Sequence, residues 1–265
     1  MQTKTTTIGL CLSGGGARGA AHIGVLKALL ENDITPGQVS GASAGAIIGA
    51  LYAAGKTPRE MLDFIQESSL IKLLSFRPWS GGITQLAYLR DRLASVIVHD
   101  SFEALSLPLY VAIANLNTGQ LEIRNSGPLF DVITASSSIP LVFKPVEIDK
   151  QQYVDGGLLC NLPAKPLVRD CDLVIGVNVM PHIEAESKTV QSVIGIAARC
   201  FELSILANTL PQAAFCDILI EPKAVSKYHI FQFNQYQQLF EIGYEETMKK
   251  LPLIKEWIAL KSGPA

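Results

Sequence analysis

The chain has 265 residues, 48% of them hydrophobic and 17% charged, and its formal net charge is −2. A chain of this length and apolar content can bury a core of its own, which argues against intrinsic disorder. Lys and Arg number 22 against 24 Asp and Glu, so the charge balance argues against a nucleic-acid-binding protein.

Strand-like and helix-like segments alternate from the start of the chain. The short apolar run 8–12 predicts a buried strand, and apolar side chains at helical spacing predict a helix over 20–30. Val39 ends a second short strand, and the small residues of 44–54 predict a helix that Gly55 closes.

The next segment carries a strong signal for the start of a helix. Thr57, Pro58 and Glu60 combine a capping box with a proline at the first helical position. Beyond it, residues 70–93 predict two helices around a flexible elbow that contains Pro78.

The second half of the chain continues the alternation. We expect a hairpin of strands 109–114 and 120–124, strands at 142–148 and 152–154, a parallel strand at 173–179, and helices at 191–206 and 241–260. Such alternation predicts a single domain over residues 1–265, with a mostly parallel central sheet and helices on both faces.

Cysteine usage and hydropathy indicate the compartment. The five cysteines are odd in number and form no CxxC pair, so we expect buried free thiols in a reducing compartment rather than disulfides or a zinc site. The polar start and the short apolar run after it predict no secretory leader, and no apolar stretch is long enough to predict a membrane-spanning helix. We therefore expect a cytoplasmic protein without a metal ion or cofactor, with peripheral contact to the inner membrane surface left open.

Residues 41–45 match the G-x-S-x-G pattern of a nucleophile elbow, with Ser43 at the centre. A serine on a sharp strand-to-helix turn crowds its neighbours, which explains Gly41 and Gly45. The helix that follows directs its amide groups at a developing negative charge. The alternative is a Gly/Ser turn before a packed helix of small residues.

A second glycine-rich motif lies between the first strand and the first helix. Gly14, Gly15 and Gly16 with Arg18 fit an anion-binding nest of backbone amides, a dinucleotide-binding turn or an ordinary tight turn. The dinucleotide interpretation needs an acidic residue after the next strand, where this chain has the serine motif instead. Because a cation at the start of a helix opposes the helix dipole, Arg18 is expected to face an anion or a carbonyl.

Asp155, Gly156 and Gly157 follow the strand predicted at 152–154. An Asp-Gly pair is a common turn, and a plain turn is one interpretation. A serine nucleophile needs a proton acceptor, however, and His182, which follows a strand, is the best histidine candidate. An aspartate in a rigid turn serves at least as well if burial raises its pKa from about 3.9.

In this order the three motifs resemble the patatin-like phospholipase family, whose pattern joins a G-G-G-x-[RK]-G loop, a G-x-S-x-G nucleophile and a D-G-[GA] acid. Residues 135–140 (Ala-Ser-Ser-Ser-Ile-Pro) and 161–163 (Asn-Leu-Pro) resemble two further segments of that family. The likeness covers about residues 8–180, and Ala42 stands where the family often has Thr. The triple serine lacks flanking glycines, and we interpret it as a helix start near the site.

The resemblance implies a three-layer α/β/α sandwich that hydrolyses fatty acyl esters of lipids. It implies Ser43 as the nucleophile and Asp155 as its base, a dyad without histidine. The backbone amides of Gly14–Gly16 would form the oxyanion hole, and Arg18 would fix that loop. Residues 70–93 are then either a mobile cover over an acyl-binding cleft or an ordinary packed helix pair.

Two other functions stay open at this point. One is acyl transfer from a thioester carrier, a class that normally pairs serine with histidine, and the other is a non-catalytic, lipid-binding regulatory protein. An α/β-hydrolase triad fits less well, because Ser43 comes after only two predicted strands. The expected partner is a lipid or acyl-ester substrate and not a nucleic acid.

Overall fold

A mixed sheet forms the centre of the computed structural model, which describes residues 6–67, 86–185 and 187–262. Its strands are β1 (Ile8–Leu12), β2 (Gln38–Gly41), β3 (Leu109–Asn115), β4 (Leu121–Arg124), β5 (Val146–Ile148), β6 (Gln151–Asp155), β7 (Leu173–Val177) and β8 (Ile218–Ile220). The order is β5-β6-β3-β2-β1-β7-β8, and β4 also pairs with β3. Strands β8, β7, β1, β2 and β3 are parallel, whereas β4, β5 and β6 pair antiparallel.

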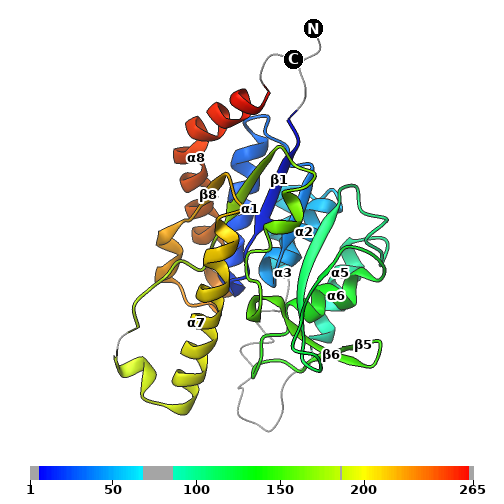
Figure 1. Ribbon diagram of the computed structural model, residues 1–265, viewed down its shortest axis with the longest axis vertical. Helices are drawn as coiled ribbons and strands as arrows, with labels where there is room; N and C mark the ends of the chain where they lie inside the picture. Colours follow the sequence, from blue (N-terminus) through cyan, green and yellow to red (C-terminus); the bar gives the residue numbers. More distant parts are fainter. Residues whose placement is uncertain (1–5, 68–85, 186, 263–265) are drawn as a thin grey trace.

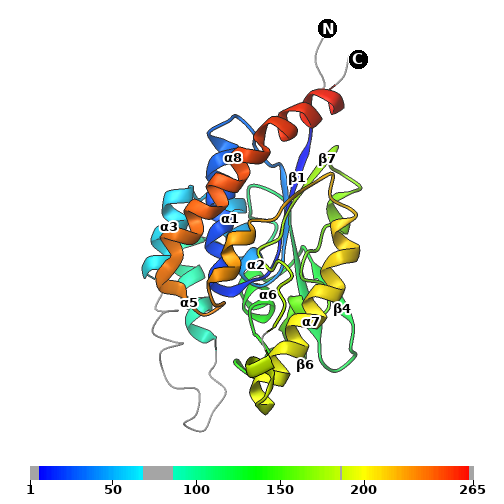
Figure 2. The same ribbon diagram turned by 90° about the vertical axis from the view of Figure 1, so that its left-hand side faces the viewer.

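Helices cover both faces of this sheet. They are α1 (Ala20–Leu30), α2 (Ala44–Ala53), α3 (Pro58–Glu67), α5 (Ala87–Val96), α6 (Leu129–Ser136), α7 (Val193–Ala213) and α8 (Tyr236–Lys261). Figure 2 shows α1, α3 and α8 on one side of the strands and α7 on the other. The fold is therefore the three-layer α/β/α sandwich that was expected, with β1 and β7 buried along their whole length because both faces are covered.

Most of the predicted elements are present. The hairpin is confirmed as β3 and β4, and the capping box is confirmed by bonds in both directions: the Thr57 N–H donates to the Glu60 carboxylate at 2.8 Å, and the Glu60 N–H donates to Thr57 Oγ1 at 3.3 Å. Helix α6 and the three-residue strand β8 were not predicted from the sequence. Of the segment 70–93, residues 70–85 lie outside the described residues, and residues 87–93 belong to α5, so the choice between a cover and a packed helix pair stays open.

The helices α1 and α8 approach each other closely because each carries a glycine at the contact. A Cβ on Gly24 would lie 2.0 Å from the carbonyl oxygen of Phe240, and a Cβ on Gly243 would lie 2.0 Å from that of Ala21. These distances are far below van der Waals contact, so neither position accepts a side chain unless a helix moves. Since α1 directly follows the glycine loop, its packing against α8 also fixes the position of the end of that loop.

Gly243→Ala is expected to lower the free energy of unfolding by about 1–3 kcal/mol, because the added methyl group forces α8 away from α1. Urea unfolding followed by circular dichroism measures the effect. Gly37→Ala is the matched control, since the nearest atom to a Cβ there is 3.9 Å away, and it should change stability by less than about 1 kcal/mol. Equal losses in the two variants would contradict the close contact.

The cysteines differ in their exposure. Cys11 and Cys160 are buried and Cys171 and Cys216 are half-buried, and burial raises the pKa of all four thiols. Cys200, on α7, is exposed, so the expectation of buried thiols is confirmed only for Cys11 and Cys160. All five are free thiols.

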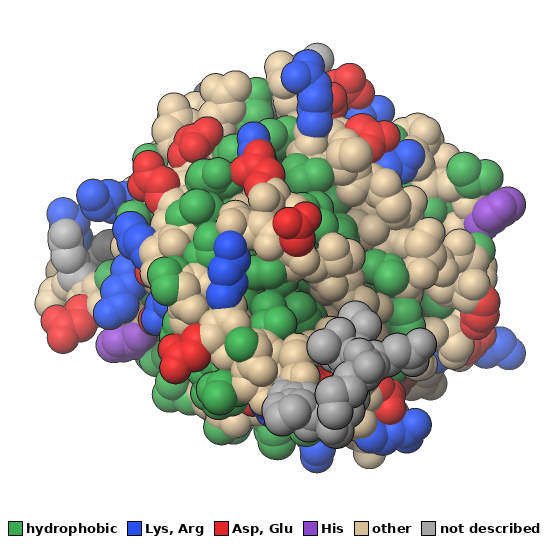
Figure 3. All heavy atoms as spheres, turned by 90° about the horizontal axis from the view of Figure 1, so that it is seen from above, with side chains coloured by type: hydrophobic (Ala, Val, Ile, Leu, Met, Phe, Trp, Pro, Cys, Tyr) green, Lys and Arg blue, Asp and Glu red, His purple; other side chains and the backbone are tan. Residues whose placement is uncertain are grey.

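The start of β1 and the end of α8 lie at the same end of the molecule (Figure 1), where Thr6 and Ser262 are hydrogen-bonded. Seen from that end, Lys and Arg side chains lie beside Asp and Glu side chains (Figure 3). Within the described parts of the chain, no helix combines the length and the apolar character needed to cross a bilayer.

Candidate active site

Strand β3 explains how two distant segments meet. Gly41 of β2 pairs with Val111, and Asp155 of β6 pairs with Ile113. Both Val111 and Ile113 pair with β4 on the other edge of β3, so β2 and β6 follow each other along one edge. The turn after β2 and the end of β6 are therefore neighbours, which brings Asp155 to the serine motif.

Ser43 occupies a strained turn between β2 and α2. Its backbone has φ 51° and ψ −123°, a conformation that a non-glycine residue adopts only when its surroundings enforce it. A Cβ on Gly41 would lie 2.5 Å from backbone atoms of Gly45, and a Cβ on Gly45 would lie 2.2 Å from the Leu12 carbonyl oxygen. The two glycines of the motif are thus required by contact distances.

The carboxyl group of Asp155 is buried next to Ser43. It accepts a hydrogen bond from the Ser43 side chain and another from the Gly157 N–H at 2.7 Å. Burial raises the pKa of Asp155 from 3.8 to about 7, and the two hydrogen bonds offset only part of the shift. A carboxyl with such a pKa can take and return a proton near neutral pH.

Backbone amides of the glycine loop lie beside this pair. The Gly14 N–H donates to the Asn161 carbonyl at 3.1 Å and is therefore not free, which corrects the expectation of three available donors. Toward the described residues, the N–H groups of Gly15 and Gly16 have no acceptor. Gly16 has φ +57°, and a Cβ there would lie 2.3 Å from the Ile230 carbonyl oxygen. Two donors are thus available for an oxyanion.

The Arg18 side chain faces carbonyl groups, as its position at a helix start predicted. Its Nε donates to the carbonyl oxygen of Tyr228 at 2.8 Å, and a terminal nitrogen lies 3.5 Å from that of Ser226. The contact ties the loop to the segment before α8. This geometry gives Arg18 a bracing position rather than one that faces the Ser43 hydroxyl.

His22 supports the glycine loop from α1, a role that the sequence analysis missed. Its Nε2 lies 2.8 Å from the Ser13 carbonyl oxygen, and burial lowers the pKa of His22 to about 4. The ring is therefore neutral at physiological pH and donates to that carbonyl. The Ser13 hydroxyl in turn donates to the Gly14 carbonyl oxygen at 3.0 Å.

The triple serine lies at the end of α6 and not at a helix start, which corrects that expectation. The Ser43 N–H donates to Ser136 Oγ at 2.9 Å, and this hydroxyl donates to the Ala112 carbonyl oxygen at 2.7 Å. The Asp155 N–H donates to the Ser138 carbonyl oxygen at 3.0 Å. One helix end thus holds the backbone of both candidate residues.

Ser136→Ala is expected to lower kcat for hydrolysis of an acyl ester, the activity that the resemblance of the motifs implies, by about 10- to 100-fold, because the Ser43 turn loses the bond that fixes it. Ser137→Ala is the control. The Ser137 hydroxyl donates to the Ile133 carbonyl within the same helix, and its loss should change kcat by less than about threefold. Steady-state kinetics compares the two variants, and similar losses would contradict this assignment.

A small pocket contains these groups. It is lined by Gly14, Gly15, Gly16, Ser43, Ile139, Asp155, Asn161, Met180, Phe201, Ile205 and Ile230. Apart from the site groups, the lining is mostly apolar, and it includes no histidine among the described residues. His182 is exposed and lies outside this lining. The cavity volume is about 20 Å³, so an acyl chain enters only when side chains move.

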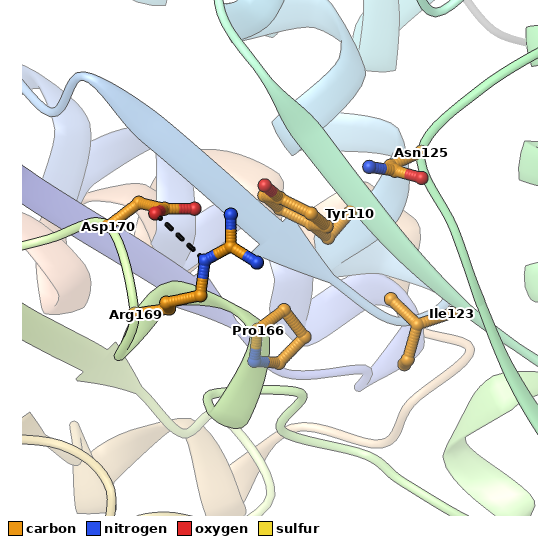
Figure 4. Close-up of a pocket in the computed structure, with 6 residues that line it drawn as sticks. All are labelled: Tyr110, Ile123, Asn125, Pro166, Arg169 and Asp170. Atoms are coloured by element: carbon orange, nitrogen blue, oxygen red, sulfur yellow. Dashed lines mark hydrogen bonds and ion pairs between the residues drawn. The ribbon is translucent and has the colours of Figure 1, made fainter.

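A larger hollow of about 370 Å³ lies elsewhere (Figure 4). Tyr110, Ile123, Asn125, Pro166, Arg169 and Asp170 line it, and neither Ser43 nor Asp155 is among them. Size alone therefore does not locate the chemistry. Among the residues that the structure describes, no cluster of three or more His, Cys, Asp or Glu could hold a metal ion.

Two curated relatives resemble this chain in sequence. An uncharacterized NTE family protein of Mycobacterium tuberculosis is 32% identical over 180 residues, which are 67% of this chain and 50% of that protein. Human patatin-like phospholipase domain-containing protein 6 is 26% identical over an alignment of 275 residues, covering 90% of this chain and 20% of that protein. The chain spans half or less of the length of these relatives.

Solved structures and a family model extend the comparison. VipD from Legionella pneumophila matches with a TM-score of 0.60 and 17% identity over 94% of this chain and 67% of that chain. Human GIVD cytosolic phospholipase A2 in complex with methyl gamma-linolenyl fluorophosphonate matches with a TM-score of 0.53 and 13% identity. The match covers 99% of this chain and 60% of that chain. These likenesses concern the fold. The family model for patatin-like phospholipases matches residues 10–168, which include all three motifs, and the chain belongs to this family.

Proposed function

We propose that this chain hydrolyses acyl esters of lipids through a covalent acyl intermediate on Ser43. The observation that carries the proposal is the hydrogen bond between the Ser43 side chain and a buried Asp155 with a pKa of about 7. The amides of Gly15 and Gly16, which have no acceptor among the described residues, and the membership of the family support it.

The first step forms the acyl-enzyme. Ser43 Oγ attacks the ester carbonyl carbon while the Asp155 carboxylate takes the hydroxyl proton, and the carbonyl oxygen becomes an oxyanion. The Gly15 and Gly16 amides stabilise that charge, and one such donor is typically worth about 3 kcal/mol. When the intermediate collapses, the ester C–O bond breaks and the alcohol leaves with the proton from Asp155.

The second step releases the acid. A water molecule attacks the acyl-enzyme while Asp155 again accepts a proton, and the bond to Ser43 Oγ breaks as that oxygen regains a proton. Aspartate serves as the base because burial raises its pKa close to the working pH.

The pocket lining indicates the acyl part of the substrate. Ile139, Phe201 and Ile205 offer apolar contacts to a hydrocarbon chain, and within the described part of the chain Asp155 is the one charged residue of the lining. These contacts favour a fatty acyl ester over a charged or sugar ester.

Fatty-acid release from dispersed phospholipid and from p-nitrophenyl esters of graded chain length tests the function. We expect release that increases with chain length and is absent in Ser43→Ala. Co-sedimentation of the protein with vesicles made of the same phospholipid measures peripheral membrane contact. No acid release from any of these esters, by a folded protein, would overturn the proposal.

A further inference from the structure

Helix α7 lies outside the residues 10–168 that match the family model, yet it is bonded to the segment that follows Asp155. Ser204, Asn208 and Gln212 each hydrogen-bond to backbone groups of residues 157–165. Because residues four apart lie on one face of a helix, these side chains form a single polar row. The row fastens α7 to the loop after the candidate base.

Asn208 makes the central contacts of this row. Its Nδ2 donates to the carbonyl oxygens of Gly157 at 2.9 Å and Leu158 at 3.2 Å, and its Oδ1 accepts the Asn161 N–H at 2.8 Å. A carboxamide is required for this arrangement, because it presents a donor and an acceptor at once.

These contacts reach both halves of the site. Gly157, whose carbonyl Asn208 holds, donates its N–H to Asp155. Asn161, whose N–H Asn208 accepts, receives the Gly14 N–H on its own carbonyl. The Asn208 side chain is therefore linked to the Asp155 carboxyl through one residue, Gly157, and to the glycine loop through one residue, Asn161.

We propose that Asn208 is a positioning residue, whose carboxamide holds the Asp155 turn and, through Asn161, the glycine loop in a fixed mutual position. For its catalytic consequence this inference rests on the proposed function. It concerns geometry, however, and the Asp155 carboxyl reports on that geometry even without a substrate.

The surroundings of Asp155 make its titration a readout. Its pKa is set by burial, by Ser43 and by Gly157, with no charged side chain among the causes. The charged groups on the helices packed nearby are paired: Arg199 with Glu202 on α7, and Asp131 of α6 with Arg90. A change at Asn208 therefore acts on Asp155 through the Gly157 turn or through a new charge.

Two variants are expected to move the titration in opposite directions. Asn208→Ala releases the turn and admits water, and because burial is the largest cause of the raised pKa of Asp155 and outweighs the bond from Gly157, that pKa should fall. Asn208→Asp has nearly the same size but places a negative charge against the turn, so the pKa of Asp155 should rise. Gln212→Ala is the matched control. It removes the hydrogen bond of the same row that the Lys165 N–H donates to Gln212 Oε1 at 3.3 Å, and it should leave the titration of Asp155 unchanged.

Kinetics on p-nitrophenyl butyrate gives the second readout. Asn208→Ala should lower kcat by about 10- to 100-fold with KM changed by less than about threefold, and its kcat/KM–pH profile should shift to lower pH. Asn208→Asp should shift the profile to higher pH, and it decides the question if Asn208→Ala does not fold.

The outcomes separate the two proposals. If the wild type hydrolyses the ester but both Asn208 variants behave like Gln212→Ala, the positioning role is wrong and the function stands. If the wild type hydrolyses no ester, the function is wrong, and the carbon-13 NMR titration of the Asp155 carboxyl decides the inference. Opposite shifts in the two variants support it, and an unmoved titration overturns it.

Discussion

Ser43→Ala is expected to lower the proposed ester hydrolase activity by at least about 10⁴-fold and to abolish covalent labelling, because among the described residues Ser43 is the hydroxyl that bonds to the Asp155 carboxyl. Methyl gamma-linolenyl fluorophosphonate, bound in the human phospholipase structure, is a suitable reagent. Intact mass spectrometry should show one adduct per wild-type chain and none on Ser43→Ala. Unfolding of this variant should stay close to that of the wild type, since alanine retains the same Cβ.

Ser137→Ala controls for the loss of a buried hydroxyl near the site. It should be labelled as fast as the wild type, because its hydroxyl bonds only within α6. Labelling of Ser43→Ala at the wild-type rate would mean that the nucleophile is another residue.

Asp155→Asn is expected to lose the hydrolase activity and to gain stability at alkaline pH. The folded-state pKa of about 7 lies above the unfolded value of about 3.9, so the wild type loses stability as the pH rises from about 4 through 7. At about 1.4 kcal/mol per pKa unit, this loss approaches about 4 kcal/mol, and the neutral asparagine avoids it. Urea unfolding at pH 5 and pH 8 should show a larger gain at pH 8.

The wild-type activity should follow the same carboxyl group. Its kcat/KM should rise with pH through a midpoint near 7, because only the ionised carboxyl accepts the Ser43 proton. Asp149→Asn, an exposed change in the β5–β6 turn, should match the wild type in both stability and activity. Two results would contradict the assigned base. One is a kcat/KM that does not rise with pH around 7, and the other is an Asp155→Asn variant that is no more stable than the wild type at pH 8.

The local parts of the site could be predicted from the sequence, because the residues that each part requires lie within a few positions of one another. The elbow around Ser43 requires glycines two positions before and after it, and that spacing is visible in the sequence. The proximity of Asp155 follows instead from the sharing of one edge of β3 by β2 and β6, which no spacing reveals. Only the resemblance to a family joined these residues.

The supporting residues were missed for the same reason. Ser136, at the end of α6, accepts a hydrogen bond from the Ser43 N–H 93 residues earlier in the chain, and Asn208 bonds to the acid turn from α7. Serines and asparagines are ordinary residues in helices and turns. The resemblance of residues 135–140 to a family segment placed Ser136 near the site but gave it no contact, and nothing in the local pattern marks Asn208. The error over the triple serine is of this kind, because a serine run fits both ends of a helix.

Cys200 gives the native chain a built-in attachment point for a reporter. Its thiol is exposed, whereas burial raises the pKa of the other four and slows their reaction with alkylating dyes. The next residue along α7, Phe201, lines the pocket. A solvatochromic dye on Cys200 would therefore signal, in real time and without mutagenesis, when a hydrocarbon chain displaces the aromatic ring beside it.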